Sequence, residues 1–332
     1  VGLRDGRTAL DERARVARWR VWRCCSWWVT VILAPMNKMN LVSSVLWLLA
    51  ATSPMVSAHD SGVIREGEIY QSQRLGKDVR YSIYLPAAYQ RDNNRRFPVL
   101  YLLHGYPTEP HDADTDWIQF GDIGAILDSE IAKGTSTAII VVMPDMGRSW
   151  YVDGEEPYGS MLAEGLVPHI DATYRTRAQQ VFRAIGGLSM GGFGALTVAM
   201  NNPDLFATSV ALSAGVYTSD ELQAFAEDIY ENAFAHWVGS GLEGEERVTD
   251  SWLRNNPLYL AEGLPLEDLR ATRWYLDVGD DDFLYKGNAA LHILLRDREV
   301  EHEYRVRNGG HDWAYWRSAM PAALAFISGR LP

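Results

Sequence analysis

The sequence is poor in cysteine. Of its 332 residues only Cys24 and Cys25 are cysteines, and both lie in an N-terminal segment that we expect to be absent from the mature protein. A mature chain without cysteine has neither a disulfide framework nor a thiolate metal site. Its stability must then come from a core, and a single domain of this size can bury about three quarters of its unfolded surface.

Positive charge is also scarce. The chain holds 31 lysines and arginines against 43 aspartates and glutamates, which gives a net charge of −12. Eight of the basic residues but only three of the acidic ones precede residue 59, so the net charge of residues 59–332 is near −17. Such a surface repels nucleic acid and anionic membranes. We therefore expect no nucleic-acid partner.

Apolar runs near the N-terminus are short. The run 41–51 has 11 residues, whereas a helix that spans a membrane needs about 20. A basic region with Lys38 precedes this run, and Val56-Ser57-Ala58, a small-residue cleavage site, follows it. We predict a signal peptide cleaved after Ala58, a secreted or periplasmic protein, and no stable membrane span.

These features divide the chain. Residues 1–35 carry seven arginines and no long apolar face, and we expect them to be upstream sequence that is not native to the protein. Residues 36–58 are the predicted signal peptide, and residues 59–332 are predicted to form a single domain. Within it, residues 218–265 are acidic, helical and loop-rich with no strand pattern, which predicts an insertion over the sheet, a candidate lid or substrate wall.

Apolar periodicity predicts an α/β fold. Residues 79–85 alternate, which is typical of a half-buried, early antiparallel strand with Ser82 and Tyr84 on its polar face. Helical patterns lie between the later strand-like runs, and Pro321 predicts either a new turn or a break in the last helix near Ser318. Strand–helix alternation favours a mostly parallel central sheet with helices on both faces. Four runs are continuously apolar, as in strands covered on both faces: 99–103, 138–143, 209–212 and 274–278.

The sharpest motif is Gly-Leu-Ser-Met-Gly-Gly at 187–192. It follows the strand-like run 181–185 and precedes a helix-like segment, so the pattern G-x-S-x-G lies in the context that it requires. Small residues let the backbone take the strained turn that exposes the hydroxyl of Ser189. The following amide, that of Met190, then lies at a helix N-terminus where it can stabilise an oxyanion. The alternative is a glycine-rich turn with an incidental serine.

A serine nucleophile needs a histidine base and an orienting acid. His311 has the best setting of the eight histidines, because it follows a strand-like run and precedes the last helix. The acid is expected between serine and histidine in the chain, at another strand end. Asp280, Asp281 and Asp282 all meet this condition; Asp282 is the first choice and Asp281 the second. A cation site there lacks the spacing of a calcium loop.

The second oxyanion donor is expected in the loop after an early strand. Residues 102–106 read Leu-Leu-His-Gly-Tyr, so the backbone amide of Tyr106 is the candidate, and His104 is expected to be structural. The aspartates at 112, 114 and 116 predict an exposed loop.

These segments together resemble the esterase D-like or "putative esterase" group of α/β-hydrolases, which includes S-formylglutathione hydrolases, feruloyl esterases, tributyrin-type esterases and mycolyltransferases. The similarity runs from about residue 79 to 326. It rests on Leu-Leu-His-Gly at 102–105, Met-Pro-Asp at 143–145 with Ser-Trp-Tyr at 149–151, the 187–192 motif, the 279–284 loop and Gly-His-Asp-Trp at 310–313. The resemblance implies an α/β-hydrolase fold, a Ser189, His311 and Asp282 triad, oxyanion amides at Tyr106 and Met190, and no cofactor or metal.

The expected activity is serine carboxylic ester hydrolysis through an acyl-enzyme. Short-chain acyl or aromatic, feruloyl-type esters, small or polymer-linked, suit an exported enzyme better than a formylglutathione does. Trp117, Trp150, Tyr151 and Trp313 are candidate substrate contacts on strand-end loops, with ordinary packing as the alternative for each. An acyltransferase of the mycolyltransferase type and a non-catalytic binding protein on the same scaffold are the competing functions. The sequence indicates neither the acyl group nor the oligomeric state.

Overall fold

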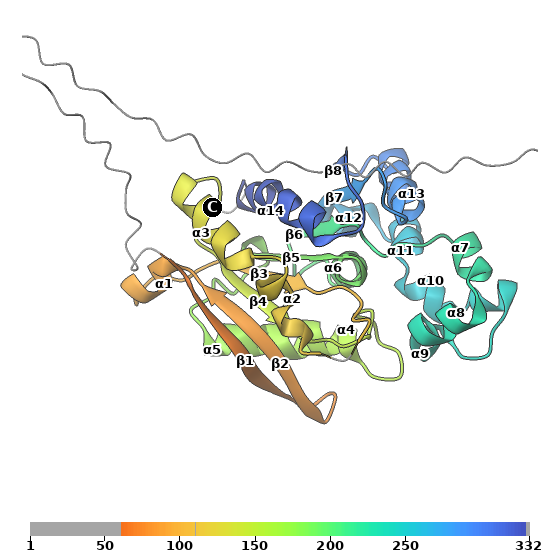
Figure 1. The fold of residues 1–332 in the computed structure, drawn as a ribbon, viewed down its shortest axis with the longest axis horizontal. Helices are drawn as coiled ribbons and strands as arrows, with labels where there is room; N and C mark the ends of the chain where they lie inside the picture. Colours follow the sequence, from red (N-terminus) through yellow and green to blue (C-terminus); the bar gives the residue numbers. More distant parts are fainter. Residues whose placement is uncertain (1–60, 110, 330–332) are drawn as a thin grey trace, which may run out of the picture. The chain divides into compact units, whose positions relative to one another are not determined.

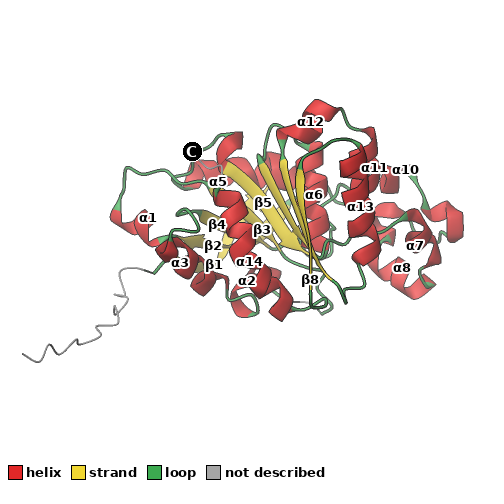
Figure 2. Ribbon diagram, turned by 90° about the horizontal axis from the view of Figure 1, so that it is seen from above, coloured by secondary structure: helices red, strands yellow, loops and turns green. Residues whose placement is uncertain are grey.

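The computed structural model describes residues 61–109 and 111–329. Their centre is an eight-stranded sheet with the order β1-β2-β4-β3-β5-β6-β7-β8 (Figures 1 and 2). β2 pairs antiparallel with both β1 and β4, and the remaining pairs are parallel. The predicted α/β architecture with an early antiparallel strand is therefore confirmed. The segments predicted over 1–35 and 36–58 lie outside the described residues.

The four continuously apolar runs form inner strands of this sheet. The side chains of β3, β4 and β6 are all buried, as are those of β7 apart from its first residue. The strands are β1 Val63–Ser72, β2 Lys77–Leu85, β3 Val99–Leu103, β4 Ile140–Pro144, β5 Arg183–Leu188, β6 Thr208–Leu212, β7 Arg273–Gly279 and β8 His302–Arg307.

Helices cover both faces of the sheet (Figure 2). Leu100 and Leu102 of β3 pack in one core cluster with residues of α3 and α14, whereas Tyr101 and Leu103 pack in the other with residues of α5 and α6. Successive strand residues thus serve opposite cores. The helices outside the insertion are α1 Ala87–Arg91, α2 Asp116–Gln119, α3 Ile123–Lys133, α4 Tyr158–Met161, α5 Val167–Thr173, α6 Met190–Asn201, α12 Leu266–Ala271, α13 Tyr285–Asp297 and α14 Trp313–Ser328.

The predicted insertion at 218–265 is helical. Thr218 and Glu221 form a capping box at its first helix, in which each side chain accepts a hydrogen bond from the backbone N–H of the other residue. Its interior is aromatic: Trp237 stacks on Trp252 with ring centroids 5.7 Å apart. Its helices are α7 Ser219–Ala224, α8 Glu227–Ala233, α9 Ala235–Val238, α10 Asp250–Asn255 and α11 Pro257–Gly263.

Two expectations about local structure are wrong. Ser82 and Tyr84 are buried, not on a solvent face. Their hydroxyls donate to Asp114 at 2.6 Å and to Asp128 at 2.7 Å, so covering segments satisfy them. Pro321 does not end the last helix, because α14 continues through it to Ser328 while its inner face remains buried. Tertiary packing outweighs the lost backbone hydrogen bond there.

Candidate active site

Ser189 lies between the end of β5 and the start of α6, in a strained turn. Its backbone has φ 53° and ψ −119°, a left-handed conformation that is unusual for a residue with a Cβ atom. The neighbouring glycines are required by close packing. A Cβ atom on Gly187 would lie 2.6 Å from Gly191, and one on Gly191 would lie 2.4 Å from the carbonyl oxygen of Leu103. The nucleophile-elbow geometry of the motif is therefore present.

His311 and Asp282 lie beside this serine. His311 Nε2 is 3.0 Å from Ser189 Oγ, and His311 Nδ1 is 2.9 Å from Asp282 Oδ2. The three side chains come from the segments that follow β5, β7 and β8, whose carboxyl ends meet at one edge of the parallel sheet. With Nδ1–H donated to the carboxylate, Nε2 is free to take the serine proton.

Asp282 is held in its ionised form. Burial by itself would raise the pKa of this carboxyl, but hydrogen bonds from His311 and from the Leu284 amide outweigh it and hold the pKa below its usual value. Of the three adjacent aspartates, this is the one that contacts the histidine.

Met190 directly follows Ser189 in the chain, and Tyr106 lines the same cavity as Ser189. Met190 is the first residue of α6, and a Cβ atom on Gly105 would lie 3.6 Å from the Cβ atom of Ser189. Neither N–H has a hydrogen-bond acceptor among the described residues. Unpaired backbone donors beside a nucleophilic serine can stabilise an oxyanion, so these two amides stay the predicted donors.

His104 supports the loop that carries the Tyr106 amide. It is fully buried, and burial lowers its pKa, so the ring is neutral. Its Nδ1–H donates to the carbonyl of Gly105 at 2.7 Å, and its Nε2 accepts the Met146 N–H at 3.0 Å. The Gly105 carbonyl and the Tyr106 N–H belong to one trans peptide and point in opposite directions. His104 therefore fixes the direction of this amide.

The cavity at Ser189 has a volume of about 490 Å³. One wall is aromatic, where half-exposed Phe120 packs against Trp313 with ring centroids 5.8 Å apart. Another wall is polar: His111 Nε2 is 2.7 Å from Asp116 Oδ1, and the Glu109 carbonyl and Asp116 raise the pKa of His111. The lining residues are Gly105, Tyr106, Pro107, Thr108, Glu109, His111, Asp116, Gln119, Phe120, Leu188, Ser189, His311, Trp313 and Trp316.

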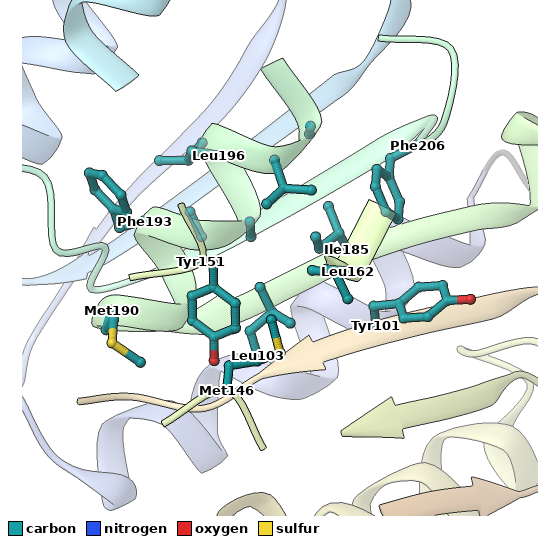
Figure 3. Close-up of a cluster of buried hydrophobic side chains, with 14 of the residues drawn as sticks. Tyr101, Leu103, Met146, Tyr151, Leu162, Ile185, Met190, Phe193, Leu196 and Phe206 are labelled. Carbon is teal, nitrogen blue, oxygen red and sulfur yellow. The ribbon is translucent and has the colours of Figure 1, made fainter. Parts of the chain in front are cut away.

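Of the four aromatic candidates for substrate contact, only Trp313 lines this cavity. Trp117 is buried and its indole N–H donates to the Leu103 carbonyl. Trp150 stacks on Phe234 of the insertion with centroids 5.0 Å apart. Tyr151 is buried in the core, where Figure 3 shows its ring among neighbouring apolar side chains, and its hydroxyl donates to the His104 carbonyl. These three side chains do not line the cavity at Ser189, and their contacts favour the packing alternative for each.

Several cavity residues were not foreseen from the sequence. His111, Phe120 and Trp316 lie in segments whose strand-end position could have indicated them. The exposed acidic loop expected at 112–116 is wrong in part, because Asp114 and Asp116 are buried against Ser82 and His111. None of the lining residues comes from the insertion at 218–265.

The described residues hold neither a metal-binding cluster nor a membrane-spanning helix. No group of three or more histidine, cysteine, aspartate and glutamate side chains in 61–109 and 111–329 is arranged to hold a metal ion. Within the same ranges, no helix has the length and apolar character needed to traverse a bilayer.

Fold and sequence comparisons define the class of the protein. A solved ferulic acid esterase superposes with a TM-score of 0.69 at 28% identity, over 82% of this chain and 99% of its own. An S-formylglutathione hydrolase from Staphylococcus aureus superposes with a TM-score of 0.64 at 22% identity, over 80% of this chain and 99% of its own, which supports the fold alone. The fold is that of the α/β-hydrolases. The chain belongs to the "Putative esterase" family, whose model matches residues 72–327, and the predicted resemblance is confirmed.

Three of the curated relatives have esterase in their names. An acetyl esterase of Caldicellulosiruptor saccharolyticus is 25% identical over 78% of this chain and 96% of its own length. An esterase of Mycobacterium tuberculosis is 33% identical over 73% of this chain and 54% of its own length. An endo-1,4-beta-xylanase/feruloyl esterase of Xylanibacter ruminicola is 32% identical over 48% of this chain and 23% of its own length. The chain thus spans about half of one of these relatives and about a quarter of another.

Proposed function

We propose that the protein is a secreted serine carboxylic ester hydrolase that acts through an acyl-enzyme on Ser189. The observation that carries the proposal is the continuous line of contacts from Ser189 Oγ to His311 Nε2 at 3.0 Å and from His311 Nδ1 to Asp282 at 2.9 Å. These residues follow three different strands, in the chain order serine, acid, histidine of the α/β-hydrolases.

The proposed reaction has two halves. Ser189 Oγ attacks the ester carbonyl carbon while His311 Nε2 takes the hydroxyl proton, and the Met190 and Tyr106 amides stabilise the oxyanion. The tetrahedral intermediate expels the alcohol, which receives the proton from His311, and an acyl-enzyme remains. Water then gives a proton to His311 and attacks the acyl carbon, and Ser189 leaves with the proton returned. Asp282 holds the imidazole in the required tautomer throughout.

The cavity supports short acyl or aromatic esters as substrates. Phe120 and Trp313 offer an aromatic, apolar wall, and His111 and Asp116 offer polar groups in the same cavity as Ser189. One relative is named a ferulic acid esterase, which agrees with aromatic esters, and another is named an acetyl esterase, which agrees with short acyl esters. A series of esters graded by acyl length, with methyl ferulate included, would choose between them. Acceptor alcohols in the same assay would reveal acyl transfer in place of hydrolysis.

Export is proposed on the sequence pattern at 36–58. The first strand, β1, begins at Val63, a few residues after the expected cleavage site at Ala58. N-terminal sequencing of the exported protein tests this, and a mature N-terminus well before His59 would contradict it.

The serine mechanism has a direct test. A fluorophosphonate should label Ser189, and Ser189→Ala should abolish turnover of p-nitrophenyl acetate and butyrate while the fold is retained. Unaltered turnover by the folded Ser189→Ala variant would refute the proposal.

A further inference from the structure

Arg148 lies in the loop that follows β4, and its guanidinium donates to two successive carbonyl groups of another loop. Its Nε donates to the carbonyl oxygen of Pro107 at 2.9 Å, and its Nη2 donates to that of Thr108 at 2.7 Å. Among the described residues, no hydrogen bond between backbone atoms involves Tyr106, Pro107 or Thr108. The guanidinium of Arg148 therefore holds a stretch of backbone that lacks the support of secondary structure.

The same guanidinium reaches the helical insertion. Its Nη1 donates to the side-chain oxygen of Asn232 at 3.1 Å, and Asn232 belongs to α8. The backbone carbonyl of Asn232 accepts a second hydrogen bond, from the hydroxyl of Tyr106 at 2.8 Å. One residue of the insertion is thus bonded both to Arg148 and to the residue whose backbone amide is a predicted oxyanion donor.

The ring of Tyr106 also contacts both partners. Cζ of Arg148 lies 5.1 Å from the centroid of this ring, within the range of a cation–π contact. The ring of Trp150 lies 6.2 Å from it, and the Trp150 indole N–H donates to the carbonyl of Ala233 in α8 at 2.7 Å. Tyr106 is therefore held by its hydroxyl, by its ring and through the carbonyl of the next residue.

We propose that Arg148 is a positioning residue for the ester hydrolysis proposed above: it fixes the loop 105–108 to the insertion and so holds the Tyr106 amide in the direction of the oxyanion. The inference rests on that proposed function, because this amide is one of its two predicted oxyanion donors. Neither Arg148 nor any residue of the insertion is among those that line the cavity at Ser189. Both therefore act on the reaction through the loop and not by contact with the substrate.

Removal of the guanidinium should slow the reaction more than it weakens substrate binding. Arg148→Met keeps an unbranched side chain but removes all three donors, so kcat should fall by about tenfold to a hundredfold. KM should change less than about threefold, because the ester in the ground state carries no oxyanion. Arg148→Lys keeps the charge without the planar fork and should restore only part of kcat.

Arg270→Met is the matched control. Arg270 lies in α12, which precedes β7, and it donates to the carbonyl of Glu299 at 3.1 Å. This substitution also removes a bond from a guanidinium to a loop carbonyl, but at the opposite edge of the sheet from the strand ends that carry Ser189, Asp282 and His311. Its kcat should equal that of the wild type.

A second measurement reports on the oxyanion directly. An alkyl trifluoromethyl ketone accepts the oxygen of a nucleophilic serine at its carbonyl carbon and gives a tetrahedral oxyanion with no leaving group, so it resembles the transition state. Its inhibition constant should rise in Arg148→Met by the factor by which kcat/KM falls. The inhibition constant of the methyl ketone with the same alkyl chain, which binds mainly as the unreacted ketone, should change little.

Two milder variants test the side of the insertion and do not depend on the folding of Arg148→Met. Asn232 is exposed, so Asn232→Leu leaves the core intact, and Tyr106→Phe removes a hydroxyl but keeps the backbone amide. Each should lower kcat by about two- to fivefold, because the bonds from Arg148 to the loop carbonyls remain. Asn232→Asp should lose less than Asn232→Leu, since a carboxylate still accepts from arginine.

The loss in the double variant Arg148→Met/Asn232→Leu should be less than additive, because the two residues share one bond. Wild-type kcat in folded Arg148→Met, an equal rise in both ketone inhibition constants, or strictly additive losses would overturn the inference. If Arg148→Met does not fold, wild-type kcat in both Asn232→Leu and Tyr106→Phe would overturn it. Ser189→Ala in the same assay separates the two proposals, because retained turnover there contradicts the hydrolase mechanism itself.

Discussion

Three consecutive aspartates after β7 have three different contacts. The carboxylate of Asp280 accepts the Gly309 N–H at 2.9 Å, and the backbone N–H of Asp281 donates to the Gly309 carbonyl at 3.0 Å. Asp282 bonds to His311. The first two therefore join the acid-bearing loop to the histidine-bearing loop, and the third orients the imidazole.

Exchange of these acids should have unequal effects. Asp282→Asn should lower kcat/KM by about 10³- to 10⁴-fold, because an amide can hold the histidine in the wrong tautomer. Asp281→Asn is the matched control and should stay near the wild-type value, since Asp281 makes its contact through the backbone. Steady-state kinetics on a p-nitrophenyl ester measures both, and an equal loss in the two variants would count against Asp282 as the acid.

The effect of Asp282→Asn on the stability of the fold should depend on pH. Because the folded-state pKa of Asp282 is lowered, its ionised form stabilises the fold near neutral pH, and this contribution is lost as pH falls through that pKa. The deficit in unfolding free energy of Asp282→Asn should therefore be larger at pH 7 than at strongly acidic pH. Urea denaturation at both pH values measures it.

His104 allows its two hydrogen bonds to be tested separately. In His104→Asn the amide nitrogen can replace Nδ1 as donor to the Gly105 carbonyl, whereas in His104→Gln the amide oxygen can replace Nε2 as acceptor for the Met146 N–H. Since the bond to Gly105 fixes the Tyr106 amide, kcat should fall further in the glutamine variant, by about tenfold to a hundredfold. Comparable kcat values in two variants of similar melting temperature would show that this bond does not matter for the oxyanion.

At the scale of elements, a buried ionic group joins β7, β8 and α14. Asp277 of β7 has no exposed surface, and it accepts hydrogen bonds from Arg307 of β8 at 3.0 Å and from the Tyr315 hydroxyl of α14 at 2.5 Å. These are the elements that bracket His311 and precede Asp282. The group therefore sets the spacing of the two loops that carry His311 and Asp282.

Removal of one partner should destabilise the fold. Arg307→Met leaves the buried Asp277 carboxylate without its cation, and we expect a loss of about 2–3 kcal/mol in unfolding free energy, reduced from the value for a fully buried pair because Arg307 is partly exposed. Arg305→Gln on the same strand is the control. Its exposed pair with Glu303 should contribute less than about 1 kcal/mol. Equal losses in urea denaturation would contradict the buried-pair account.

The elements differ in how far the sequence predicts them. β3, β4, β6 and β7 follow from continuous apolar runs because both of their faces are covered. β1 does not, since it is an edge strand with largely exposed side chains and a register shift between Arg65 and Glu68. Tyr84 lies on the face opposite Tyr81 and Ile83, as the alternation predicts, but that face is buried and not polar, because alternation within β2 cannot reveal a covering helix that offers Asp128.

At the scale of the whole molecule, the order of residues along the chain predicts the candidate site better than residue type does. Ser189, Asp282 and His311 were placed by their positions after strands, and the structure brings them together. Trp117 and Trp150 also follow the expected loops, but their side chains turn inward. Their direction depends on partners distant in the sequence, such as Phe234 of the insertion for Trp150, and a local pattern carries no information about those partners.

The two sides of the cavity differ in their tolerance of change. At the nucleophile, Gly187 and Gly191 touch backbone atoms so closely that no larger residue fits. The opposite wall comes from a connecting loop with His111, the residue Phe120 that follows the short helix α2, and Trp313 in the first turn of α14. Directed evolution toward another ester should therefore randomise this wall and leave the glycines fixed, and natural divergence in substrate preference can follow the same route without disturbing the reaction chemistry.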